Sequence, residues 1–250
     1  MKIAVCIKRV PDMEARFKIA GDGKSVDYTG LKFDMNDFDS WAVEAALQLK
    51  EKAGQGEVVI ISLGPDAVQE TIRKALSMGA DRGVQLAAAE IPFDGFAIAS
   101  ALAAELKDGA YDLVFFGKQA PDSANGVVGI MVAELLGYAA VSSINKLELQ
   151  GTSGTAERAI EGATEVVQFP VPAVLTVDEG LNQARYPSLK GIMAAKKKQI
   201  EQKPAQLGAA TVSIQAMAMP PERAPGRILG EGAAAVPELV QLLQTEAKVI

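Results

Sequence analysis

Short hydrophobic runs alternate with apolar residues at helical spacing over roughly the first 140 residues. β-Branched and apolar runs predict strands at 3–7, 57–62, 83–88 and 112–117. Helical spacing predicts one helix that starts near residues 39–40, one that starts at residue 68 and ends at Gly79, and two more at 95–106 and 125–136. The alternation predicts an α/β fold with a doubly wound, mostly parallel sheet.

The pattern changes after Gly137. Segments 142–151, 155–162 and 164–177 alternate like strands and predict a small antiparallel β addition, with an edge or bend near Pro170 and Pro172. Residues 202–232 are rich in Pro, Gly, Ala and Gln and predict an extended arm. We therefore divide the chain into an α/β domain, 1–201, and a C-terminal arm and helix, 202–250.

The final helix carries one apolar stripe, formed by Val236, Leu239, Val240, Leu243 and Ala247. Such a stripe needs a surface to cover. Packing on another subunit and packing on the chain's own domain both satisfy it.

Composition narrows the possible functions. The chain of 250 residues has no histidine, which excludes Ser-His-Asp triads, Cys-His pairs and His-ligated metals. Acid–base catalysis would then need an Asp, Glu, Lys or Tyr with a shifted pKa, and we assign no catalytic residue and no metal ligand. Its net charge of −6 argues against nucleic-acid binding. No apolar run reaches the ~18 residues that span a bilayer, so no membrane insertion is expected. The first residues resemble a core strand without a transit or secretory segment, and the single Cys6 fits a reducing compartment.

Three strand ends could hold a ligand. They are "KRVPD" after the first strand, Ser62-Leu63-Gly64, and "GKQAPDSANGVVG" at 117–129, where glycines allow close approach and helix N–H groups can hold a phosphate. No P-loop or GxGxxG motif is present. The stretch "MNDFD" at 35–39 could instead only cap the following helix through Asn36, Asp37 or Asp39.

Residues 182–198, "NQARYPSLKGIMAAKKK", combine a Tyr-Pro turn, a lone leucine and three lysines. The turn precedes a helix predicted at 191–200. The lysines fit either local solubility or contact with a partner.

Many spaced segments together resemble the β subunit of electron-transfer flavoproteins. They include "KRVPD", "MNDFDSWAVEAALQLKE", "SLGPDAVQETIRKALSMGADRG", "DLVFFGKQ" and, most specifically, "ERAIEGATEVVQFPVPAVLT" followed by N-x-x-R-Y-x-[ST]-L. The resemblance covers nearly the whole chain and implies a Rossmann-like, adenine nucleotide alpha hydrolase-like fold. It also implies a heterodimer with an α subunit that carries the redox-active FAD.

The resemblance implies a nucleotide, usually AMP, inside the β subunit. The residues that would line its pocket are Cys6, Asn36, Asp37, Phe38, Asp39, Leu63, Asp122, Ser123, Ala124, Asn125, Gly126, Val127, Val128 and Gly129. Members often carry Asn-Gln-Thr-Gly or Ala-Gln-Val-Gly where this chain has Gly126–Gly129, which puts more weight on backbone N–H groups here. Met13 would lie near the α-subunit flavin.

The resemblance also implies partners. A recognition loop at about 184–198, with Leu189 as its anchor, would dock flavin dehydrogenases such as acyl-CoA dehydrogenases, and a quinone oxidoreductase would receive the electrons. Its contact residues would be Tyr186, Leu189, Ile192, Met193, Lys196, Lys197 and Lys198. The expected location is the bacterial cytoplasm, or the mitochondrial matrix in a eukaryote. Two alternatives remain: an electron-bifurcating member with a second FAD, and a stand-alone adenine-nucleotide-binding or hydrolysing protein.

Overall fold

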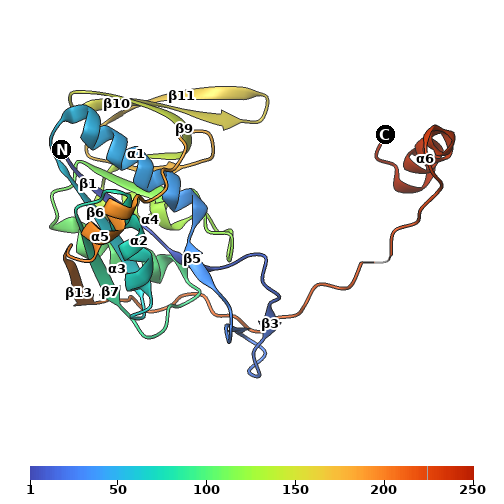
Figure 1. Ribbon diagram of the computed structural model, residues 1–250, viewed down its shortest axis with the longest axis horizontal. Helices are drawn as coiled ribbons and strands as arrows, with labels where there is room; N and C mark the ends of the chain where they lie inside the picture. The colour runs from blue at the N-terminus through green and yellow to red at the C-terminus, as the bar shows by residue number, and fades with distance from the viewer. Residues whose placement is uncertain (224) are drawn as a thin grey trace. The chain divides into compact units, whose positions relative to one another are not determined.

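The computed structural model describes residues 1–223 and 225–250 (Figure 1). It divides into two units, Met1–Ala216 and Met217–Ile250. The first unit contains a nine-stranded sheet in the order β11-β10-β9-β12-β8-β1-β6-β7-β13. Its strands are β1 (Lys2–Cys6), β6 (Glu57–Gly64), β7 (Arg82–Ala87), β8 (Leu113–Gly117), β9 (Ala139–Gln150), β10 (Ser153–Ile160), β11 (Ala163–Pro170), β12 (Ala173–Val177) and β13 (Ile200–Pro204).

The sheet is parallel from β9 through β12 to β13, whereas β10 and β11 add antiparallel strands at one end. Ala4 in β1 lies beside Val59 of β6 and Val114 of β8, and all three are fully buried. These strands are covered on both faces of the sheet, which explains why their sequences are continuous apolar runs. The predicted doubly wound α/β fold with a small antiparallel addition is therefore confirmed.

Helices pack on both faces of the sheet. They are α1 (Asp37–Ala53), α2 (Val68–Met78), α3 (Gly95–Lys107), α4 (Val128–Leu136) and α5 (Leu189–Ala195). Val43 of α1, Ile72 of α2 and Ala195 of α5 share one core cluster, and Leu102 of α3 and Val132 of α4 share the other. Two short hairpin-like pairs, β2 (Arg9–Pro11) with β5 (Phe33–Met35) and β3 (Lys18–Ile19) with β4 (Val26–Asp27), complete the unit.

Two predicted helices, α4 and α5, have wrong boundaries. Helix α4 begins at Val128 rather than residue 125, because Ala124 and Gly126 have φ of 50° and 64°, which a right-handed helix cannot include. Helix α5 spans Leu189–Ala195 rather than 191–200, because the Ser188 hydroxyl caps it by accepting the Gly191 N–H at 3.0 Å. Residue 200 instead begins β13.

The chain after β13 first follows the same unit. The Ala205 N–H donates to the Ala87 carbonyl at 2.9 Å, and the Asp94 carboxylate accepts the Val212 N–H, also at 2.9 Å. Asp94 at the same time caps α3 by accepting the Phe96 N–H at 2.8 Å. Hydrogen bonds from the N–H and hydroxyl of Thr211, together with the one from Val212, hold the pKa of Asp94 well below its usual range. The contacts of Ala205, Thr211 and Val212 fix part of the predicted arm without regular secondary structure.

The second unit contains a 3₁₀ turn at Ala233–Ala235, α6 (Val236–Leu242) and a π turn at Leu243–Ala247. The helix predicted near the C-terminus is thus present, but its geometry changes along its length. Val236, Leu239 and Val240 of its apolar stripe are exposed. An amphipathic helix of this size buries little surface by itself.

Candidate functional site

The carboxylate of Asp39 joins the ends of two neighbouring parallel strands. Its Oδ2 accepts the Lys8 N–H at 2.6 Å just beyond β1, and its Oδ1 accepts the Gly117 N–H at 2.9 Å where β8 ends. The chain proceeds from β1 to β6 and β7 on one side and then returns to place β8 on the other. Ligands of doubly wound sheets bind at this reversal of strand order, beyond the carboxyl ends of the strands.

Burial dominates the electrostatics beside this carboxylate. It raises the pKa of Asp39 to about 7, although the hydrogen bonds from Lys8 and Gly117 act in the opposite direction. Burial, followed by the nearby charge of Asp39, also raises the pKa of the Cys6 thiol. Cys6 therefore stays protonated near neutrality, and the site has no activated thiolate nucleophile.

The alternative that "MNDFD" only caps α1 does not hold. Asn36 occupies the N-cap position, yet its side chain makes no capping bond, and its Nδ2 donates instead to the Gln119 carbonyl at 2.8 Å. Its Oδ1 is buried and accepts no hydrogen bond from the described residues. Asp37 is exposed, and Asp39 connects strands as described above. A buried acceptor without a donor is costly, so Asn36 offers a ligand an unsatisfied polar group.

Glycine lets the backbone approach closely around the β8 end. A Cβ on Gly117 would lie 2.5 Å from Asp39 Oδ1, and one on Gly129 would lie 2.7 Å from Thr176 Cγ2. Between them, Ala124 and Gly126 adopt left-handed backbone angles. The loop from β8 to α4 is thus folded tightly against the strand ends.

The structure brings most of the predicted pocket residues to one edge of the sheet. Cys6 ends β1 and Leu63 lies near the end of β6, in the same core cluster. The loop that contains Asp122, Ser123, Ala124 and Asn125 follows β8, and Gly126 and Val127 lead into α4. Val128 and Gly129 form the first turn of α4. Phe38 packs edge-on against Trp41 with ring centroids 5.2 Å apart. Met13 belongs to a different segment, the exposed loop between β2 and β3.

Two lysines at this edge were not assigned from the sequence. The Lys8 ammonium lies 2.7 Å from the Asp122 carboxylate, and the Lys118 ammonium lies 2.8 Å from that of Asp178. Lys118 also lies 5.2 Å from the centroid of the Phe38 ring. Both lysines belong to segments that the sequence singled out, "KRVPD" and the loop after β8, but their pairing joins distant parts of the chain. Each of these lysines at the strand ends is therefore paired with an aspartate.

A second distinctive surface lies on the segment 184–198, which we call the docking loop after the role that the resemblance leads us to expect. Tyr186 is 95% exposed, Leu189 is 84% exposed and Met193 is 63% exposed, and Ile192 is also exposed. Large apolar side chains that cluster in this way commonly mark an interaction surface. The apolar residues that we expected to contact a partner are thus all exposed on the docking loop.

The three lysines at the end of the docking loop are not equivalent. Lys196 and Lys197 are exposed. The Lys198 ammonium instead donates to the carbonyls of Leu76 at 3.0 Å and Ala80 at 2.5 Å, where α2 ends. A cation is favourable at the C-terminus of a helix. Lys198 therefore fastens the loop to α2, unlike Lys196 and Lys197.

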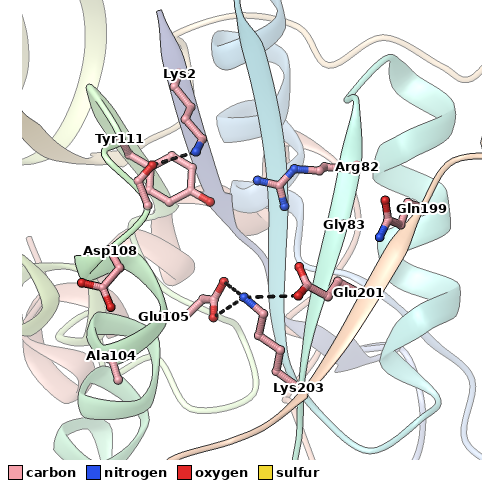
Figure 2. A pocket seen from close by; sticks show the side chains of 11 residues that line it. Lys2, Arg82, Gly83, Ala104, Glu105, Asp108, Tyr111, Gln199, Glu201 and Lys203 are labelled. Carbon is pink, nitrogen blue, oxygen red and sulfur yellow. Dashed lines mark hydrogen bonds and ion pairs between the residues drawn. The ribbon is translucent and has the colours of Figure 1, made fainter.

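A cavity of about 370 Å³ lies at the opposite edge of the sheet, near the amino ends of β1, β7 and β13 (Figure 2). Its cationic groups already have carboxylate partners: Arg82 lies 2.8 Å from Glu57, and Lys203 lies 2.9 Å from Glu105. The Lys2 ammonium donates to the Gly109 carbonyl at 2.7 Å. The switch point remains the better candidate, because ligands of doubly wound sheets bind beyond the carboxyl ends of the strands and this cavity lies at the amino ends.

Comparisons with known proteins agree with this geometry. The family model described as "Electron transfer flavoprotein domain" matches residues 25–207. The chain is 38% identical over 250 residues to an electron transfer flavoprotein subunit beta of Bradyrhizobium diazoefficiens, with complete coverage of both chains. The chain belongs to the electron transfer flavoprotein beta-subunit family.

Further members of the family show how widely the similarity extends. The subunit beta of Syntrophomonas wolfei is 37% identical, over all of this chain and 98% of that protein. The subunit beta of Mus musculus is 39% identical over 90% of this chain and 91% of that protein. The match spans both the switch point and the docking loop. Among the described residues, no helix is long and apolar enough to cross a membrane.

Proposed function

We propose that this chain is the β subunit of a heterodimeric electron carrier whose redox-active FAD is held mainly by an α subunit. It receives electrons from flavin dehydrogenases such as acyl-CoA dehydrogenases and delivers them to a membrane quinone oxidoreductase or another acceptor. The proposal rests on full-length similarity to subunits with this name, supported by the reversal of strand order at which ligands of such sheets bind. The chain itself then makes and breaks no covalent bond.

The residues at the switch point fit AMP. The buried Asn36 Oδ1 lacks a donor, which an adenine amino group or a ribose hydroxyl can supply. The N–H groups that open α4 have no carbonyl one turn earlier in that helix and can hold a phosphate. Gly117 and Gly129 let the ends of this loop pack closely against Asp39 and Thr176.

We assign the nucleotide pocket to Cys6, Asn36, Asp37, Phe38, Asp39, Leu63 and 122–129. AMP supplies no redox chemistry and would act as a structural ligand that stabilises the folded subunit. Val127 and Val128 offer only their backbone polar groups, and hydrogen bonds near a flavin ring would need polar side chains. These identities favour AMP over a second FAD.

Docking to dehydrogenases is assigned to the loop that carries Tyr186, Leu189, Ile192 and Met193. An exposed leucine that enters a partner's pocket contributes roughly 1.5–3 kcal/mol of burial. Exposed Lys196 and Lys197 would attract acidic partners and speed association without fixing one pose. Met13 is assigned to the neighbourhood of the α-subunit flavin.

Co-expression with a candidate α subunit tests the proposal. We expect a yellow 1:1 heterodimer on size-exclusion chromatography, whose flavin is reduced by an acyl-CoA dehydrogenase and its substrate. A colourless chain that remains alone and binds adenine nucleotides would support the stand-alone alternative and contradict the proposal.

A further inference from the structure

Two carboxylates of α1 hold the guanidinium of Arg185 at the start of the docking loop. Its Nε and Nη2 lie 2.7 and 2.9 Å from the carboxylate oxygens of Glu44. Its Nη1 and Nη2 lie 2.6 and 3.0 Å from those of Glu51. Both contacts are bidentate, and this geometry matches the planar guanidinium in a way that a lysine cannot.

The carboxylates are themselves well placed for this contact. Glu44 and Glu51 are two helical turns apart and therefore lie on one face of α1. The side chain of Glu44 is only 4% exposed, and Gln48 also donates to it at 2.8 Å. Nearby, Asn182 Nδ2 donates to the Trp41 carbonyl at 3.0 Å. The chain thus enters the docking loop already fixed to α1.

The far end of the docking loop is fixed to α2. The Arg73 guanidinium donates to the carbonyls of Ala195 and Lys198, both at 2.5 Å. Gly191 packs so closely that a Cβ there would lie 2.3 Å from the Ser77 carbonyl oxygen. Between these two attachments, the side chains of Tyr186 and Leu189 remain almost fully exposed.

We infer that Arg185 is a positioning residue that holds Leu189 in its docking orientation through Glu44 and Glu51. The inference rests on the proposed docking function. A loop that is ordered before binding loses less conformational freedom when the partner arrives. The contacts of Arg185 with α1 would therefore raise the affinity of docking through Leu189, although they do not touch the partner.

The test is Arg185→Lys in the flavin-loaded heterodimer, which keeps the charge and removes the bidentate geometry. We expect amide hydrogen exchange to accelerate at 186–195. With an acyl-CoA dehydrogenase as electron donor, we expect the KM for the heterodimer to rise about 2- to 10-fold with kcat unchanged, the range for ordering one loop segment. Unchanged hydrogen exchange in the loop, or an unchanged KM, would overturn the inference.

Two further comparisons separate positioning from general damage to the fold. Glu51→Gln removes the outer carboxylate alone and should produce a weaker form of the same effects, whereas Lys52→Gln, an exposed neighbour on α1, should produce neither. Combined with Leu189→Ala, Arg185→Lys should add little, because it acts through that leucine. Additive losses would contradict the inference. Electron transfer by the wild-type heterodimer tests the proposed function separately, so the two failures are distinguishable.

Discussion

At the scale of single residues, Asp39 connects positions 31 and 78 residues away in the sequence. From the residues alone its segment could be a helix cap, and the family resemblance implied a place in the nucleotide pocket. Helix capping is local and can be recognised from sequence, whereas a bond to the end of β8 depends on how the sheet is assembled. The same limit applies to the Lys8–Asp122 ion pair, which the sequence did not predict.

Asp39→Asn should destabilise the heterodimer in a pH-dependent way. An amide accepts only one of the two N–H groups that the carboxylate satisfies, which costs about 1–3 kcal/mol. The folded pKa of about 7 lies above the ordinary value of 3.8, so the wild type is stabilised at low pH and loses that contribution as pH rises through 7. The difference in stability between variant and wild type should narrow from pH 5 to about pH 7, by at most ~1.4 kcal/mol per pH unit, and level off above it. Thermal melts at fixed protein concentration measure it, and a gap independent of pH would contradict this account.

Leu189→Ala should weaken docking and leave the fold intact. The side chain is 84% exposed, and exposed substitutions usually change stability by less than ~0.5 kcal/mol. Loss of a modest hot spot costs ~1–2 kcal/mol, a rise of roughly 5- to 30-fold in the KM for the heterodimer. Steady-state reduction by a dehydrogenase measures this, with Leu189→Met as the conservative control. A lower melting temperature with unchanged kinetics would mean that Leu189 only packs within its own loop.

At the scale of elements, apolar runs found the buried strands and missed β13. That strand, Ile200–Pro204, is mostly polar and pairs with β7 at the edge of the sheet through its backbone. Edge strands need no apolar run, so hydrophobic periodicity does not detect them. The start of α4 was also predicted wrongly. Hydrophobic periodicity does not report the left-handed backbone angles of Ala124 and Gly126, which follow from tertiary packing.

Gly117→Ala tests the tight packing of β8 against α1. The added Cβ would lie 2.5 Å from both Asp39 Oδ1 and Phe38 Cβ, so the strand end and α1 must separate. We expect a loss of about 1–3 kcal/mol of stability together with weaker nucleotide retention. Gly21→Ala is the matched control, because nothing lies within 4 Å of its Cβ position. Equal stability of the two variants, measured by thermal melts, would show that the β8 end tolerates expansion.

At the scale of the whole molecule, the chain ends in a unit, Met217–Ile250, whose helix leaves an apolar stripe exposed. We predict that truncation before Pro220 abolishes assembly with the α subunit, because the stripe needs a surface to cover. Size-exclusion chromatography of the truncated chain mixed with α measures this. Normal heterodimer formation would show that this unit is dispensable for assembly.

The bound ligands decide whether this chain is an AMP-containing subunit of an electron carrier. The co-expressed heterodimer is purified and denatured, and the released nucleotides are separated and counted by chromatography. The account predicts one FAD and one AMP per heterodimer, with AMP retention weakened by Asn36→Ala because Asn36 carries the buried acceptor at the switch point. Two FAD and no AMP, as expected for an electron-bifurcating member, would contradict the assignment of the pocket. The absence of any flavin would contradict the electron-carrier function itself.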